Sequence, residues 1–241
     1  YIAWLMDAGC KTKDEMYAEI FSENSHFIEE GRTLLVSEFG KNYGIYFSVL
    51  QEIAMGNTTQ ALIEAKLGGM SIGGYIKQLE ETYTLIRRVR PIFAKPQGKT
   101  VQFLICDPFL RFWFRHVEKN RSLVELQNFD GLLRLAQMHY TTYSGLLLED
   151  YFRQKMAETG EWREIGSWWQ SKAIDFQGRK IDAEVDVVAL PLTGRNVVVA
   201  EVKRQYENYE HELFMAKVEY LKQKELRGYS IRTQLLTLEN M

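Results

Sequence analysis

The sequence has few of the residues on which thiol, disulfide or histidine-based sites depend. It contains two cysteines, Cys10 and Cys106, which lie far apart and form no metal-binding or redox motif. Its four histidines are not paired at short spacing, and no nucleophile motif accompanies them. These absences argue against thiol redox chemistry, a histidine-based metal centre and Ser-His-Asp catalysis, and they favour a reduced, cytoplasmic protein.

The sequence also lacks a signal peptide, a membrane-length apolar run and a strong net charge, which is −2. Any nucleic-acid-binding surface must therefore be local. A phosphate-binding loop is missing, because Gly98-Lys99-Thr100 has Phe93 where that motif needs its first glycine. We expect no membrane association and no ATP binding or hydrolysis by these residues.

The first half of the chain is rich in helical patterns. Residues 1–40 read as a helical start followed by a helical pattern over 13–39. Three short helices are predicted at 43–56, 60–68 and 71–83, followed by strands at 84–93 and 99–107. Three helices and a hairpin are the layout of a winged helix-turn-helix, which we place at 41–106. The aromatic stretch 107–121 is apolar almost all round and predicts a buried helix within a connector at 107–140.

In a winged helix the third helix meets the major groove and the hairpin contacts phosphates. Basic residues cluster in these two elements: Lys77, Arg87, Arg88, Arg90, Lys95 and Lys99. Such a local basic patch is what phosphate contact requires, and we expect DNA as a partner. Gly73 and Gly74 leave few side chains for base readout. A protein-docking module or a plain solvated face stays open as an alternative.

The last 100 residues predict a helix at 142–158, a strand at 161–170, two strands at 183–190 and 195–204, a helix at 208–226 and a strand at 229–238. If the hairpin folds symmetrically about Thr193-Gly194, Asp186 lies opposite Glu201 and Glu184 opposite Lys203. All four then share one face, and the other face is a valine- and alanine-rich core.

Two carboxylates directly opposite each other repel, and a divalent cation between them would offset the repulsion. The alternative is an ordinary hairpin with one wet face, in which Glu184 and Lys203 form a cross-strand ion pair while Asp186 and Glu201 are solvated.

The order of elements, with Asp on one strand and Glu-x-Lys on the next, resembles the restriction-endonuclease-like, or PD-(D/E)xK, nuclease superfamily. The resemblance implies that Asp186 and Glu201 bind Mg²⁺ or Mn²⁺, with Glu149 on the preceding helix in support. It implies that Lys203 holds or polarises the attacking water near the scissile phosphate. The proline of the family name is absent, since Val185 precedes Asp186.

Nearly the whole chain resembles the C-terminal part of the archaeal-type ATPases of the AAA+/STAND class. The resemblance rests on the ordered segments AMGNTT, KQLEE, DPFLRFWFR, GSWW, EVDVVA and AEVK. It implies a P-loop ATPase domain before this chain, which would carry any ATP site, and makes residues 1–40 a remnant of its helical lid. The start at Tyr1 rather than Met agrees with a fragment of a longer protein.

The fold expected is therefore α/β and multidomain (α+β): lid remnant at 1–40, winged helix at 41–106, connector at 107–140, and a restriction-endonuclease-like αβββαβ domain at 141–241. Two functions stay open. One is DNA binding through the winged helix with Mg²⁺-dependent endonuclease activity. The other is a non-catalytic module that binds DNA or a protein, including a second copy of itself, and regulates an ATPase.

Overall fold

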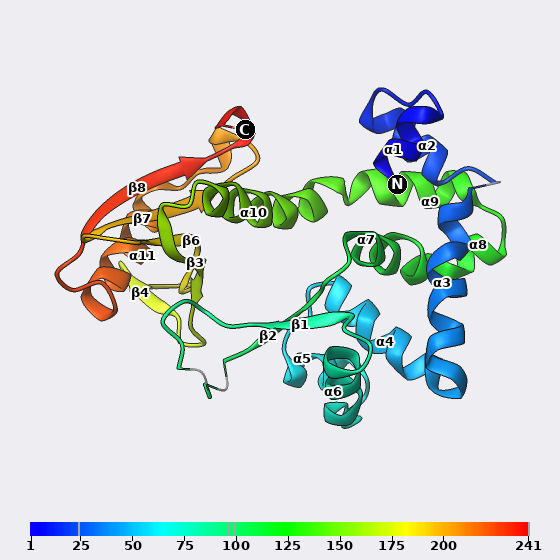
Figure 1. The fold of residues 1–241 in the computed structure, drawn as a ribbon, viewed down its shortest axis with the longest axis horizontal. Helices are drawn as coiled ribbons and strands as arrows, with labels where there is room; N and C mark the ends of the chain where they lie inside the picture. The colour runs from blue at the N-terminus through cyan, green and yellow to red at the C-terminus, as the bar shows by residue number, and fades with distance from the viewer. Residues whose placement is uncertain (24, 96, 99, 241) are drawn as a thin grey trace. The chain divides into compact units, whose positions relative to one another are not determined.

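The computed structural model describes residues 1–23, 25–95, 97–98 and 100–240. The fold is mixed α/β and multidomain, as predicted, and it divides into two compact units (Figure 1). Unit 1 comprises Tyr1–Val89 and Gln102–His139, and unit 2 comprises Arg90–Val101 and Tyr140–Met241. The four segments expected from the sequence do not coincide with these two units, because residues 90–101 of the expected 41–106 segment belong to unit 2. That four-part division stays a prediction. Within the described ranges, no helix is both long enough and apolar enough to span a bilayer.

Unit 1 begins with α1 (Ile2–Asp7), α2 (Lys13–Ile20), α3 (His26–Phe39) and the 3₁₀ turn η1 (Gly40–Asn42). The predicted continuous pattern over 13–39 is wrong in one respect, because two helices form. Thr12 starts α2 with a capping box, in which its hydroxyl accepts from the Glu15 N–H and the Glu15 carboxylate accepts from the Thr12 N–H. After α2, the Ser22 hydroxyl donates to the Glu19 carbonyl, a local bond that competes with helix continuation.

Three helices and a hairpin follow in the predicted order: α4 (Tyr43–Ala54), α5 (Gln60–Lys66), α6 (Gly73–Glu81), β1 (Ile86–Val89) and β2 (Gln102–Ile105). The strands are shorter than predicted and pair antiparallel, with Ile86 opposite Ile105. Thr59 caps α5 by accepting from the Leu62 N–H. The hairpin is divided between the units, because its connection, Arg90–Val101, belongs to unit 2.

The unit closes with α7 (Pro108–His116), η2 (Glu118–Asn120), α8 (Arg121–Glu125) and α9 (Phe129–Met138). Asp107 caps α7, whose apolar sequence buries Trp113 completely. The Trp113 indole N–H donates to the Ile28 carbonyl at 3.0 Å, and its ring lies against Gly31, where a Cβ would come within 2.4 Å. The aromatic stretch is therefore core, and Gly31 permits the close approach of α3 and α7.

Unit 2 contains α10 (Tyr140–Glu158), β3 (Trp162–Trp169), β4 (Ile174–Phe176), β5 (Arg179–Ile181), β6 (Glu184–Pro191), β7 (Asn196–Val202), η3 (Tyr206–Asn208), α11 (His211–Lys224), β8 (Ser230–Leu236) and η4 (Leu238–Asn240). Its sheet has the order β3-β6-β7-β8 (Figure 1). The first two pairings are antiparallel, and β7–β8 is parallel because α11 provides the crossover. The small hairpin β4–β5 was not predicted.

The register of the central hairpin matches the prediction, since Val187 lies opposite Ala200 and Val188 opposite Val199. The alternative of an ordinary hairpin with one wet face is wrong, however. Val188 and Val199 pack with α11, while Val187 and Ala200 pack with α10. Helices thus cover both faces of β6 and β7, so the acidic residues of this hairpin sit at the border of a core and not on a solvated sheet.

The edge strand β3 is covered by the other stretch of unit 2. The Ile92 N–H donates to the Ser167 carbonyl at 2.9 Å, and Ile92 is buried in the same core as Val188 and Phe214. Gly166 leaves room for this approach, because a Cβ there would lie 3.4 Å from the Ile92 Cβ. Residues 90–101 are therefore part of this unit's packing.

Candidate functional site

Asp186 and Glu201 lie on adjacent strands, β6 and β7, at the end of the sheet where their ladder stops. An Asp186 carboxylate oxygen accepts a hydrogen bond from the Val202 N–H at 2.7 Å. The side chain thus accepts from a backbone donor of β7 beyond the last paired residues of the two strands, Val187 and Ala200. This bond fixes the Asp186 carboxylate beside the Glu201 strand.

Glu201 is 6% exposed and is the most constrained of the charged residues at this end of the sheet. Its Oε1 accepts from the Lys203 Nζ at 2.8 Å and lies 3.7 Å from the Lys217 Nζ. Its Oε2 is buried and has no hydrogen-bond partner among the described residues. A buried carboxylate oxygen without a donor is unfavourable, so this atom is a natural place for a bound cation or water.

Lys203 follows β7, and its backbone N–H donates to the Leu236 carbonyl of β8 at 2.9 Å. The predicted alternative of a Glu184–Lys203 ion pair is wrong. Lys203 pairs with Glu201, two residues before it, and Glu184 lies opposite Trp169 of β3 and forms no ion pair within the described part of the chain. Burial lowers the pKa of Lys203, but the bond to Glu201 and the nearby carboxylates raise it by more, so the net pKa is raised.

The carboxylates influence each other across α10 and β6. Burial, and then the charge of Asp186, raises the pKa of Glu149 to about 8. Burial, and then the charge of Glu201, raises the pKa of Asp186 to about 6, against the Val202 hydrogen bond, which lowers it. Burial and mutual repulsion thus both favour the protonated carboxyls, and a divalent cation would offset the repulsive part.

Two residues that the sequence reasoning missed complete this cluster. Arg153 donates to the Asp186 carbonyl at 2.6 Å, and its guanidinium lies 3.6 Å from Glu149 and 2.8 Å from Asp150. Lys217 on α11 contacts Glu201. A signal for Lys217 existed, because it lies three residues after buried Phe214 and four before buried Leu221, on the inward helix face. We call Glu149, Arg153, Asp186, Glu201, Lys203 and Lys217 the carboxylate–lysine cluster.

The predicted metal ligands are Asp186, Glu201 and Glu149. Across the described ranges, no three acidic, histidine or cysteine side chains come together as a metal-binding group. The donors that fit a hard divalent cation are the unpartnered Glu201 Oε2 and the Asp186 carboxylate. Glu149 is linked to Asp186 through Arg153, which contacts both residues, and through the charge of Asp186, which raises the pKa of Glu149. The role of Glu149 as a metal ligand stays a prediction.

The predicted DNA-binding residues have different surroundings. Arg88 donates to Glu80 at 2.6 Å, with its guanidinium 5.7 Å from the centre of the Phe103 ring, and Lys77 lies 3.8 Å from Glu81. The remaining four residues differ in exposure. Arg87 and Lys95 are exposed, Arg90 is half-buried, and Lys99 lies outside the described residues. Arg87 and Lys95 form no ion pair within the described ranges, so they are the better candidates for phosphate contact.

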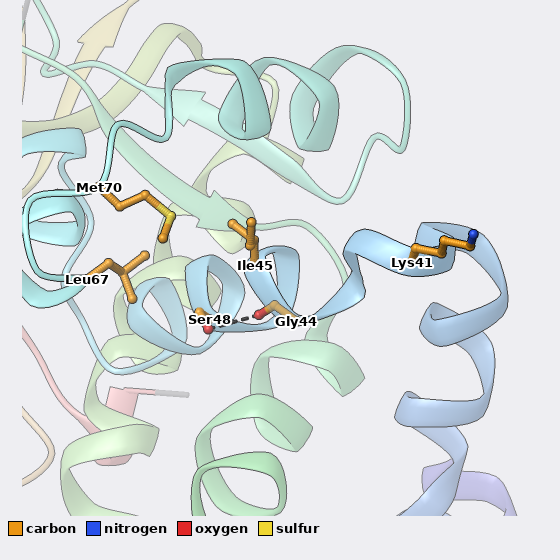
Figure 2. Close-up of a pocket in the computed structure, with 6 residues that line it drawn as sticks. All are labelled: Lys41, Gly44, Ile45, Ser48, Leu67 and Met70. Carbon is orange, nitrogen blue, oxygen red and sulfur yellow. Dashed lines mark hydrogen bonds between the residues drawn. The ribbon is translucent and has the colours of Figure 1, made fainter.

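Unit 1 also has a shallow pocket of about 300 Å³, shown in Figure 2. It is lined by Lys41, Gly44, Ile45, Ser48, Leu67 and Met70. The side chains of Ile45, Leu67 and Met70 face this space, and Lys41 points away from it (Figure 2). None of the predicted site residues lines it.

Comparison with known proteins finds that the part of the chain containing the carboxylate–lysine cluster matches a family model. Residues 113–218 match DUF234, a family described as archaea bacterial proteins of unknown function. An uncharacterized protein of Methanocaldococcus jannaschii is 28% identical over 167 residues, which cover 66% of this chain and 35% of the relative. The chain thus aligns with about a third of that relative's length, and no solved structure matches it. The region from Trp113 to Val218, which carries the whole carboxylate–lysine cluster, is similar to the DUF234 family of archaeal and bacterial proteins.

Proposed function

We propose that the carboxylate–lysine cluster cleaves phosphodiester bonds of DNA in the presence of Mg²⁺ or Mn²⁺. The observation that carries this proposal is the buried Glu201 Oε2, which lacks a partner among the described residues, beside Asp186 and two lysines. The order α10, β3, β6, β7, α11, β8 of the main sheet and its two helices supports it, with the β4–β5 hairpin inserted between β3 and β6. This is the order of elements that resembles the PD-(D/E)xK nucleases.

In this proposal Asp186 and Glu201 would hold the divalent ion. Such an ion would lower the pKa of a bound water and neutralise charge on the phosphate. Lys203 stays protonated at neutral pH, because its pKa is raised, and so it serves as a fixed positive charge for the water or phosphate. Arg153 holds β6 against α10 through the Asp186 carbonyl and so keeps the carboxylate in place.

A decisive experiment uses Asp186→Asn. The amide oxygen of Asn can still accept from the Val202 N–H, so the fold survives, and loss of the repulsion from Glu201 leaves it neutral or stabilised without metal. We expect loss of Mn²⁺-dependent nicking and loss of Mn²⁺-induced thermal stabilisation. Asp175→Asn is the matched control, because Asp175 is exposed on β4 and pairs with Lys180 at 2.9 Å. An unmutated chain that shows neither effect on single-stranded, duplex and branched DNA would contradict the proposal.

The second candidate is a non-catalytic module that binds DNA or a protein and regulates an ATPase. The Lys203–Glu201 ion pair favours it, because a lysine neutralised by its neighbour is a weaker electrostatic catalyst. The ATPase link rests on the resemblance of the ordered segments, and a cytoplasmic location belongs to the same proposal. Wherever DNA is bound, in either candidate, we place the contact on the basic residues of the winged-helix-like segment.

That DNA contact is measurable without cleavage. Arg87→Ala and Lys95→Ala should each lower the slope of log affinity for duplex DNA against log salt by about 0.9. Lys77→Ala, which removes a lysine near Glu81, is the control and should change the slope less. An unchanged slope in both variants would show that neither Arg87 nor Lys95 contacts a DNA phosphate.

A further inference from the structure

The segment that follows Lys203 presents an exposed aromatic ring beside the carboxylate–lysine cluster. Tyr206 is 65% exposed and opens the 3₁₀ turn η3. It lies three residues after Lys203, a stretch that spans at most about 11 Å. An exposed tyrosine alone is an ordinary surface feature, so its surroundings decide what it means.

The segment is held at both ends. Before Tyr206, the Arg204 guanidinium donates to the Ser144 hydroxyl at 2.5 Å and lies 5.0 Å from the centre of the Tyr140 ring. After it, the half-buried Tyr209 packs 5.9 Å from the Phe214 ring. The turn itself is closed by a hydrogen bond from the Tyr209 N–H to the Tyr206 carbonyl at 3.0 Å. Tyr206 is thus presented from an anchored turn.

The two tyrosines are linked to the cluster electrostatically and to each other by ring contact. Burial, and then the negative charge of Glu201, raises the pKa of Tyr209, so this hydroxyl is within electrostatic range of the carboxylate. The ring centres of Tyr206 and Tyr209 are 6.4 Å apart and tilted by 56°. Because three residues span at most about 11 Å, the chain itself keeps the exposed Tyr206 near Lys203 and the place where the scissile phosphate would bind.

We propose that Tyr206 is a stacking platform for an unpaired nucleobase, so the substrate is single-stranded or locally unpaired DNA. This inference rests on the proposed function and names its substrate class. A base inside a duplex has both faces covered by its neighbours, whereas an unpaired base can stack on an aromatic side chain. Arg204 and Lys203 add positive charge along the same segment, which suits the backbone of that strand.

The test is binding of a fluorescently labelled single-stranded oligonucleotide, measured by anisotropy in EDTA so that cleavage does not interfere. Tyr206→Ala should weaken binding by about 5- to 150-fold, the range found when one base-stacking aromatic is removed. Tyr206→Phe should bind like the unmutated protein, because stacking needs the ring and not the hydroxyl. Leu192→Ala, at a side chain of the same unit that is 58% exposed, is the control and should have no effect.

A duplex of the same sequence and a single-stranded RNA complete the experiment. A loss confined to single strands supports the platform, and comparison of DNA with RNA shows which strand it serves. Equal affinity of Tyr206→Ala and the unmutated protein for single strands overturns the inference, as does an equal loss on the duplex. If nicking depends on Asp186 but Tyr206→Ala does not weaken single-strand binding, the stacking inference is wrong and the nuclease proposal stands. If binding depends on Tyr206 but no nicking occurs, only the enzyme proposal fails.

Discussion

Lys217 is a residue whose contact with the carboxylate–lysine cluster is revealed by the folded chain. Its Nζ lies 3.7 Å from a Glu201 carboxylate oxygen, its side chain is 17% exposed, and it comes from α11, the helix that follows β7. Glu201 keeps Lys203 when Lys217 is lost, so the carboxylate is not left without any cation. We expect Lys217→Gln to reduce the free energy of unfolding by about 1 kcal/mol.

Urea denaturation of Lys217→Gln against Lys222→Gln measures this effect. Lys222 is exposed on the same helix, so its substitution controls for helix propensity and net charge. Equal stability of the two variants would show that Lys217 is a solvated surface lysine.

The raised pKa values of Glu149 and Asp186 make stability depend on pH. Both carboxyls hold their protons more tightly when folded, so the folded state binds more protons than the unfolded state between about pH 4 and pH 8. The stabilisation is full below the unfolded pKa values and is lost as the pH rises through about 6 and then about 8. We therefore expect the melting temperature to fall between pH 5 and pH 8.5.

Glu149→Gln mimics the protonated carboxyl at every pH and should remove much of this dependence. At pH 8.5 the variant should be more stable than the unmutated protein, by an amount on the order of 2 kcal/mol. Glu158→Gln, at an exposed position of the same helix, serves as the control. If the melting temperatures of all three proteins change with pH in the same way, Glu149 is not the source of the pH dependence.

At the level of elements, the packing of α3 on α7 depends on one missing side chain. A Cβ on Gly31 would come within 2.4 Å of the buried Trp113 ring, too close for any relaxed contact. Gly31→Ala should therefore destabilise the protein by about 1–3 kcal/mol through overpacking. Gly44→Ala in α4 has open space for its Cβ and should be neutral or slightly stabilising.

Thermal unfolding of these two variants checks the argument, because the substitution is identical and only the surroundings differ. If Gly31→Ala melts at the temperature of Gly44→Ala, the close approach of the two helices is wrong.

Local sequence patterns predicted most elements and the hairpin register. The two apolar runs of β6 and β7 flank a short turn at Thr193-Gly194, which predicted the register, and Val187 does lie opposite Ala200. The pattern could not show that helices cover both faces, because that depends on where α10 and α11 return to the sheet. For the same reason the cluster was predicted only in part. Asp186, Glu201 and Lys203 are neighbours on a hairpin, whereas Arg153 and Lys217 reach them by tertiary packing.

At the level of the whole molecule, the chain enters unit 2 twice, first for residues 90–101 and again from Tyr140 onward. A composition-based reading places the first stretch in the winged-helix segment, because its neighbours in sequence are β1 and β2. Only the bond from Ile92 to Ser167 and the burial of Ile92 reveal that it belongs elsewhere. The region matched by the DUF234 family, residues 113–218, leaves out both this stretch and β8.

This arrangement determines where the chain can be cut. A fragment that begins at Tyr140 would keep all four strands of the sheet but would leave β3 as a bare edge, ready to pair with another copy. We expect such a fragment to form soluble aggregates that grow with concentration in light scattering, while the full 241-residue chain does not. Joining residues 90–101 to its N-terminus through a flexible linker should restore a monodisperse species. That outcome would mean that the segment around Ile92, which lies between two strands of unit 1 in sequence, protects the edge of the unit 2 sheet from association.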